Sequence, residues 1–287
     1  MRTVLGQVEA YGRMIRFSHS VFALPFALAS VALAGQLGRV TARQVLWIVV
    51  AMVAARSAAM GFNRLADQET DARNPRTAGR ELPSAVLSRG EVWAFVVVSV
   101  AAFVLAAARL NPLCLALSPV ALAIVLGYSY TKRFTAASHL VLGLSLALGP
   151  VGAWLAIRGR LDPLPLVLGL AVVLWVAGFD TIYACQDVDF DRREGLRSMP
   201  VRLGVARALA VARGLHVAAF LLLLGLYWLA PLHPLYLAGV AGVAALLAFE
   251  HSLVRPDDLR RVMQAFNLNG WVSLGYFAFV AAAAWLD

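Results

Sequence analysis

Apolar residues occur in long runs that short polar segments separate. These runs are long enough to cross the roughly 30 Å hydrocarbon core of a bilayer as helices. Nine of them cover residues 20–36, 44–62, 91–109, 112–130, 138–157, 163–183, 205–229, 233–251 and 266–286. The pattern predicts an all-α, multi-pass membrane protein with nine transmembrane helices in a single bundle around a central cavity that opens to the cytosolic side. No polar linker interrupts it, so residues 1–287 are expected to form one domain.

Composition and charge agree with this prediction. Hydrophobic residues make up 61% of the chain and charged residues 14%, far from the balance of a soluble domain. With the N-terminus inside, the cytosolic segments hold 19 of the 25 basic residues and the external segments hold five. This asymmetry follows the positive-inside rule, so the net charge of +9 requires no nucleic acid. We expect the cytoplasmic (inner) membrane, an active site that faces the cytosol, and no cleaved signal peptide in residues 1–20.

The first unusual polar segment follows the second apolar run. In a continuing helix, Asn63, Asp67 and Asp71 are four residues apart and share one face. Like charges at this spacing destabilise an isolated helix. Pro75 disfavours helix at the preceding residue, so the acids lie in the last turns, where the helix dipole adds further negative charge. The pattern therefore predicts a bound cation.

A second segment of the same design ends the sixth apolar run. Asp187 and Asp191 follow the two acids of the first segment by 120 residues, and Gly195 is a plausible stop for the helix. We interpret the two carboxylate pairs as one site built from two helix ends. Asp180 lies seven residues before Asp187 on the same face, and an acid at membrane depth is functional by default. Tyr183, between them, is a candidate substrate contact.

Cationic side chains near these acids are candidates for binding phosphate. Arg80 lies in the polar loop after the first motif, where an arginine can bind phosphate through two hydrogen bonds; solvated positive-inside charge is the alternative. Lys132 is the only lysine in the chain and follows Tyr128 at the end of the fourth run. A single lysine among arginines suggests a need for a compact ammonium, although chance also explains one residue.

Further polar residues have two interpretations each. Arg56 lies within the second apolar run on the face of Asn63, and such a charge usually faces a cavity or a partner. Arg16 and His19 are three residues apart at the start of the first run, either above the active site or as an interfacial anchor. We interpret His216 as an isolated packing histidine, and Asn269 as a helix cap or a residue that lines the site.

Two facing carboxylate pairs with cations around them suit a magnesium-bound diphosphate. Mg²⁺ is bound by one or two carboxylates together with phosphate oxygens of the substrate. Bridging metal ions also neutralise the charge that develops as diphosphate leaves. Membrane helices would bury a long apolar tail, so the expected substrate is a polyprenyl diphosphate and the expected cofactor is Mg²⁺.

The same residues carry a family resemblance. The chain resembles the UbiA superfamily of intramembrane prenyltransferases, whose signatures are Asn-x3-Asp-x3-Asp and a second Asp-x3-Asp. These match Asn63, Asp67 and Asp71, then Asp187 and Asp191, and the resemblance covers the whole chain. The fuller strings resemble the 4-hydroxybenzoate polyprenyltransferase branch, which includes futalosine-pathway enzymes that act on a dihydroxynaphthoate. Two residues differ from the family strings. Arg64 stands where an Asp is common, which favours the enzymes that act on a dihydroxynaphthoate. Ala85 stands where Gly often follows Pro-Ser.

The resemblance implies a reaction and a ligand set. Asp67, Asp71, Asp187 and Asp191 would hold Mg²⁺ and assist ionisation of the prenyl diphosphate. The allylic cation would then attack an aromatic hydroxy acid beside its hydroxyl, in ubiquinone or menaquinone biosynthesis. Asp180 or the released diphosphate would take the proton. The partners expected are therefore a polyprenyl diphosphate, an aromatic acid acceptor and the lipid bilayer.

Three other functions share some of these features. Another lipid-forming prenyltransferase of the same superfamily would use the same motifs. A cation-coupled transporter would place its acids near the bilayer midplane, whereas these acids lie at helix ends. A CDP-alcohol phosphotransferase requires Asp-Gly-x2-Ala-Arg followed by closely spaced Asp in one segment, which this sequence lacks.

Overall fold

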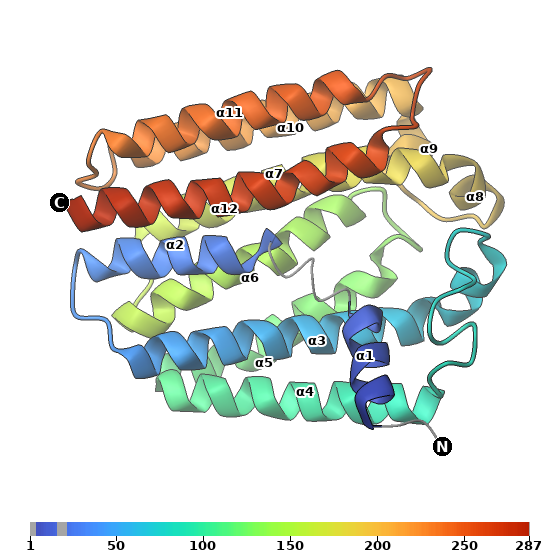
Figure 1. Ribbon diagram of the computed structural model, residues 1–287, viewed down its shortest axis with the longest axis horizontal. Helices are drawn as coiled ribbons and strands as arrows, with labels where there is room; N and C mark the ends of the chain where they lie inside the picture. Colours follow the sequence, from blue (N-terminus) through green and yellow to red (C-terminus); the bar gives the residue numbers. More distant parts are fainter. Residues whose placement is uncertain (1–3, 16–21, 287) are drawn as a thin grey trace. The chain divides into compact units, whose positions relative to one another are not determined.

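The computed structural model of the protein describes residues 4–15 and 22–286, with the backbone alone for residues 4–8. These residues are helical, with turns between the helices and no strand among them (Figure 1). The elements are α1 (Val4–Met14), α2 (Leu24–Gly35), α3 (Ala42–Arg73), α4 (Arg89–Leu110), α5 (Pro112–Thr131), α6 (Ser138–Arg158), α7 (Pro163–Ala184), a 3-10 turn (Cys185–Asp187), α8 (Val188–Arg193), α9 (Met199–Leu203), α10 (Val205–Leu226), α11 (Leu235–Leu253) and α12 (Val262–Leu286).

The predicted all-α membrane architecture is confirmed, but the count of nine spanning helices is not. Eight helices of the described chain are long and apolar enough to cross a membrane. The first predicted span, 20–36, contains α2, a helix of 12 residues. At 1.5 Å per residue, α2 is about 18 Å long and falls short of the roughly 30 Å core.

Local sequence signals explain where several helices begin and end. Ser88 and Glu91 form a capping box at the start of α4, in which Glu91 Oε2 accepts a hydrogen bond of 2.7 Å from the Ser88 amide. Pro163 follows Asp162 in the first turn of α7, where its missing amide hydrogen has no helical partner to lose. Gly159 ends α6 in the left-handed conformation that glycine adopts without strain.

Packing within the chain divides it into two compact units. The first contains α1, α3 from Trp47 onward, α4 and α5 as far as Tyr130. The ring of Tyr11 stacks on Phe95 at 4.9 Å between centroids, so α1 lies against α4. A core of Met14, Leu65, Val96 and their neighbours connects α1, α3, α4 and the loop before α4.

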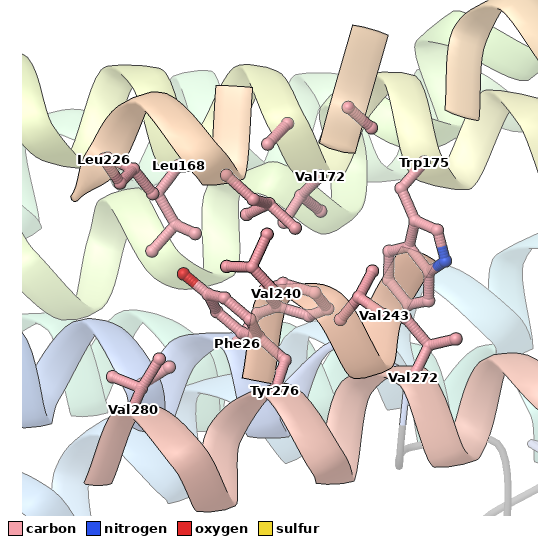
Figure 2. Close-up of a cluster of buried hydrophobic side chains, with 14 of the residues drawn as sticks. Phe26, Leu168, Val172, Trp175, Leu226, Val240, Val243, Val272, Tyr276 and Val280 are labelled. Carbon is pink, nitrogen blue, oxygen red and sulfur yellow. The ribbon is translucent and has the colours of Figure 1, made fainter. Parts of the chain in front are cut away.

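The second unit contains α2, the chain that follows it as far as Leu46 at the start of α3, and the residues from Thr131 onward. Its helices α6, α7, α10, α11, α12 and α2 pack side by side around one large apolar core. Figure 2 shows part of that core, in which Phe26, Trp175 and Tyr276 meet side chains from the neighbouring helices. Phe26 is 4.9 Å from the Trp175 ring and 5.0 Å from the Tyr276 ring, centroid to centroid.

Close approach of two helices in this unit depends on a glycine. A Cβ atom at Gly143 of α6 would clash with the Val173 carbonyl oxygen of α7. Because that obstacle is backbone, a side chain at 143 would force the helices apart. The absence of a side chain at Gly143 therefore sets how closely α6 and α7 pack.

The prediction of a single domain with a central cytosol-facing cavity stays a prediction.

Candidate active site

The first carboxylate motif lies on an unbroken helix, as predicted. α3 continues through both acids and ends at Arg73, two residues before Pro75. The Asn63 amide nitrogen Nδ2 donates to Asp67 Oδ2 at 3.2 Å, across one turn. Asp67 and Asp71 are both buried. The three predicted residues of this motif therefore form one polar stripe within the first unit.

The loop after α3 returns Arg80 to the end of the motif. Arg80 Nη1 donates to both oxygens of Asp71, at 2.8 Å to Oδ1 and 2.7 Å to Oδ2. Thr77 and Asn74 hold the turn: the Thr77 hydroxyl donates to the Asp71 carbonyl at 3.0 Å, and the Asn74 carbonyl accepts from the Thr77 amide at 2.9 Å. Arg80 thus offsets the negative charge of the α3 C-terminus and of the acids on it.

Arg64, the residue that departs from the family pattern, has a structural contact in this unit. Its guanidinium is buried, and Nε donates to the Met14 carbonyl at the end of α1 at 3.4 Å. Arg64 therefore joins α3 to α1. The other candidate cation of α3, Arg56, lies near Tyr128 of α5 and interacts with it electrostatically.

The second carboxylate motif differs from the first in its backbone. α7 ends at Ala184, a 3-10 turn covers Cys185–Asp187, and α8 begins at Val188. Asp187 and Asp191 therefore do not share one continuous α-helix, as the repeated spacing suggested. Successive residues rotate by about 120° in a 3-10 turn and by about 100° in an α-helix, so the two acids lie on different segments and the angle between them differs from that in the first motif. Gly195, with φ of +69°, ends α8 as predicted.

Lys132 is brought to this second motif. It lies close enough to Asp191 for an electrostatic interaction, as does Asp187. The loop after α8 is fastened to the segment that contains Lys132, because the Arg197 amide donates to the Lys132 carbonyl at 2.7 Å and Arg197 Nη1 donates to the Phe134 carbonyl at 2.9 Å. Each unit therefore supplies two carboxylates and one nearby cation.

Asp180 has a partner that the sequence did not suggest. Its Oδ2 atom lies 2.6 Å from Nδ1 of His139, the second residue of α6. The other ring nitrogen of His139 accepts a hydrogen bond of 3.2 Å from the Met199 amide, where α9 begins. Tyr183, one turn after Asp180, packs its ring on Phe266 at 4.8 Å between centroids. Arg16 and His19 lie outside the described residues.

A second buried polar group was also missed. His216 is not isolated: Nδ1 lies 3.0 Å from His251 Nε2, and Nε2 lies 3.1 Å from the Trp175 carbonyl. Asn269, which was expected to cap a helix or line the site, is buried and donates to Glu250 Oε1 at 2.9 Å. The signal that could have revealed this group is Glu250 itself, a single acid inside an apolar run.

The carboxylates suit a hard cation, which each motif would bind with two oxygen-donor side chains. Within the described residues of each unit, no three His, Cys, Asp or Glu side chains converge on a point where they could hold a metal ion. Two carboxylates per motif are nevertheless what Mg²⁺ takes from protein when phosphate oxygens complete its shell. The donor set therefore fits a metal that arrives with a phosphorylated substrate.

Comparison with known proteins identifies the family. The model of the UbiA prenyltransferase family matches residues 23–283. The chain belongs to the UbiA prenyltransferase family. This UbiA protein is 35% identical over 246 residues to the 4-hydroxybenzoate octaprenyltransferase of Xanthomonas euvesicatoria pv. vesicatoria (strain 85-10), covering 83% of the chain and 80% of the relative. A protein of the same name from Azoarcus sp. (strain BH72) is 30% identical over 286 residues, covering 97% and 98%.

Solved structures agree with the family. The UbiA homolog from Aeropyrum pernix K1, in its apo form, superposes with a TM-score of 0.85 at 35% identity, over 92% of this chain and 98% of that chain. A UbiA homolog from Archaeoglobus fulgidus bound to DMAPP and Mg²⁺ gives a TM-score of 0.73 over 95% and 99%, and at 19% identity it shows the fold alone. The predicted family and enzyme class, an aromatic prenyltransferase of the membrane, are confirmed.

Proposed function

We propose that this UbiA enzyme transfers a polyprenyl group from polyprenyl diphosphate to an aromatic hydroxy acid, either 4-hydroxybenzoate or a dihydroxynaphthoate. One observation carries the proposal: each unit presents a pair of acids with its own cation, Arg80 in the first unit and Lys132 in the second. The names of the two curated relatives support 4-hydroxybenzoate as acceptor. The Archaeoglobus fulgidus homolog, bound to DMAPP and Mg²⁺, supports a prenyl diphosphate donor.

In this proposal the two motifs face the same diphosphate. Asp67 and Asp71 from one unit and Asp187 and Asp191 from the other would hold Mg²⁺. The metal would neutralise the charge of the leaving diphosphate. Arg80 and Lys132 would bind phosphate oxygens, and the apolar helices would bury the prenyl chain.

Arg80 has two tasks in this arrangement. Its Nη1 nitrogen donates to both oxygens of Asp71. When phosphate arrives, the fork geometry of the guanidinium suits phosphate as well as carboxylate. Arg80 would therefore exchange Asp71 for a phosphate oxygen and leave that acid available to the metal.

The reaction then proceeds through the prenyl cation. The C–O bond to the diphosphate breaks, and its electron pair leaves with the diphosphate. The ring carbon beside the hydroxyl forms the new C–C bond with the allylic carbon. Loss of the proton from that ring carbon restores aromaticity.

The acceptor is tested with purified protein, Mg²⁺ and a prenyl diphosphate, supplied with each aromatic acid separately. We expect prenylation of one or both acids, and none of the matched phenol that lacks the carboxylate, because the site should offer a cation to the carboxylate. Arg56 is the described candidate for this cation, with Arg16 and His19 outside the described residues. Prenylation of the phenol with neither acid converted would contradict both the carboxylate contact and the branch assignment.

Arg56→Ala separates the two substrates. If Arg56 binds the acceptor carboxylate, its loss should raise KM for the aromatic acid roughly tenfold or more, as for a lost charged hydrogen bond, and leave KM for the prenyl diphosphate within about twofold. The reverse result would place Arg56 in the phosphate site.

We also propose the cytoplasmic membrane, with both motifs on the cytosolic side. In a cysteine-free background, single cysteines in the 72–89 and 192–203 loops should resist an impermeant thiol reagent added to intact cells, because positive-inside charge holds these segments in the cytosol. A cysteine in the 159–162 loop, expected outside, serves as the matched control and should react. Reaction of either basic loop from outside would contradict a shared cytosolic site.

A further inference from the structure

The contact between His139 and Asp180 joins three segments of the second unit. His139 lies at the start of α6, Asp180 lies in the last turns of α7, and the Met199 amide that donates to His139 opens α9. The His139 side chain is 4% exposed, whereas the Asp180 side chain is 24% exposed. The imidazole is thus enclosed, and the carboxylate that it contacts is partly open.

The hydrogen-bond partners assign the tautomer of His139. A backbone amide can only donate, so Nε2 of His139 must accept the 3.2 Å hydrogen bond from Met199 and carries no hydrogen. A neutral imidazole then has its hydrogen on Nδ1, which donates to Asp180 Oδ2 at 2.6 Å. The ring can take up a proton on Nε2 only by breaking its bond to the α9 backbone. His139 is therefore arranged as a donor to Asp180 and poorly arranged as a base.

The second carboxylate oxygen of Asp180, Oδ1, is not the one that His139 contacts. Among the described residues, His139 is the only group that forms a hydrogen bond with this carboxylate, and it binds Oδ2. Asp180 is seven residues before Asp187, which corresponds to about 10 Å along a helix. This places an oriented carboxylate oxygen on α7, about two turns before the second carboxylate motif.

We propose that Asp180 accepts the proton that the aromatic ring loses, and that His139 is the positioning residue that orients the Asp180 carboxylate. The inference rests on the proposed function. After the new C–C bond forms, the C–H bond at the substituted ring carbon breaks. Its electron pair returns to the ring, and the proton moves to Oδ1 of Asp180. The diphosphate leaves as an ion and is not required as the base.

Asparagine and glutamine at position 139 separate the two contacts of the imidazole. The amide nitrogen of Asn can take the place of Nδ1 and donate to Asp180. The amide group of Gln reaches the place of Nε2, where its oxygen can accept from the Met199 amide. If His139 served only to fasten the α9 backbone, Gln would preserve activity and Asn would not. If His139 acts through Asp180, the order is reversed.

The experiment measures kcat and KM of His139→Asn, His139→Gln and Asp180→Asn with whichever acceptor the wild-type enzyme prenylates. Asp180→Asn should lower kcat about a hundredfold, the lower range for a general base, and leave KM for the prenyl diphosphate within about twofold. His139→Gln should lower kcat roughly tenfold, as for one lost charged hydrogen bond. His139→Asn should restore most of that loss.

An isotope effect provides a readout that a purely structural role would not change. With an acceptor deuterated at the ring position that is prenylated, Asp180→Asn should show a larger primary isotope effect on kcat than wild type, because proton removal becomes slow. An unchanged isotope effect with near-normal kcat in Asp180→Asn would overturn the inference, as would a more active His139→Gln than His139→Asn. If Asp180→Asn does not fold, the comparison of activity between His139→Asn and His139→Gln tests the inference by itself. A wild-type enzyme that prenylates neither acid would instead refute the proposed acceptor, so the two failures are distinguishable.

Discussion

Alanine in place of Asp67, Asp71, Asp187 or Asp191 is expected to lower kcat at least about a hundredfold, comparable to the loss of a principal electrostatic stabiliser of a transition state. Each motif contributes only two carboxylates, and within either unit no three metal-binding side chains of the described residues converge. One motif alone cannot hold the metal ions that balance a departing diphosphate. The measurement is steady-state turnover of purified, folded protein at saturating Mg²⁺.

The chain supplies matched controls for this series. Glu69 lies between the acids of the first motif and is exposed. Asp189 lies between the acids of the second, with 87% of its side chain exposed and only a 3.9 Å contact to Arg192. Alanine at either control position should leave kcat within about twofold, because exposed ion pairs contribute little. Near-normal turnover of one of the four site variants would remove that residue from the proposed metal site.

Removal of the metal should have an effect at least as large. Excess EDTA is expected to lower turnover at least about a thousandfold, because a bridging ion provides several kcal/mol of charge stabilisation in the transition state. Added Mg²⁺ should restore turnover fully. Ca²⁺ should restore it poorly, since its longer bonds and looser geometry differ from those of Mg²⁺.

Substrate binding gives an independent measure of the same dependence. The affinity for a non-hydrolysable prenyl diphosphate analogue, measured by calorimetry, should fall when Mg²⁺ is withheld from wild type. The same withdrawal should change affinity much less in Asp67→Ala, because that variant has already lost part of the metal site. Turnover in EDTA equal to turnover in Mg²⁺ would refute the metal assignment.

Most helices were predictable because membrane depth imposes a simple rule on the sequence. Backbone groups in lipid must be satisfied within the helix, so a long apolar run such as 91–109 becomes a helix, here Arg89–Leu110. The end of α3 was also predictable, since Pro75 restricts the residue before it. The shortness of α2 was not, because length at the edge of the spanning range depends on packing rather than on hydropathy.

The site was predictable in its acids and not in their partners. Asp67 and Asp187 stand out because carboxylates do not belong at the ends of apolar runs. The bond from His139 to Asp180 joins residues 41 positions apart, and no local pattern encodes which face of α6 meets α7. The 3-10 turn in the second motif was equally hidden, since its spacing repeats that of the first. The contact of His216 with His251 was hidden in the sequence for the same reason, because the two histidines come from different helices.

The close packing of α6 on α7 at Gly143 keeps His139 within reach of Asp180. Gly143 is one turn along α6 from His139, and its backbone neighbour Val173 is two turns along α7 from Asp180. A larger residue at 143 would widen the gap that a 2.6 Å hydrogen bond must span. The effects of substitutions at 143 and 139 on activity should therefore be strongly non-additive, as expected for positions coupled through a backbone shift. Once a larger residue at 143 has separated the helices, a change at 139 has little further effect. A side chain at position 143 would therefore remove the contact to Asp180 even in a protein that keeps His139.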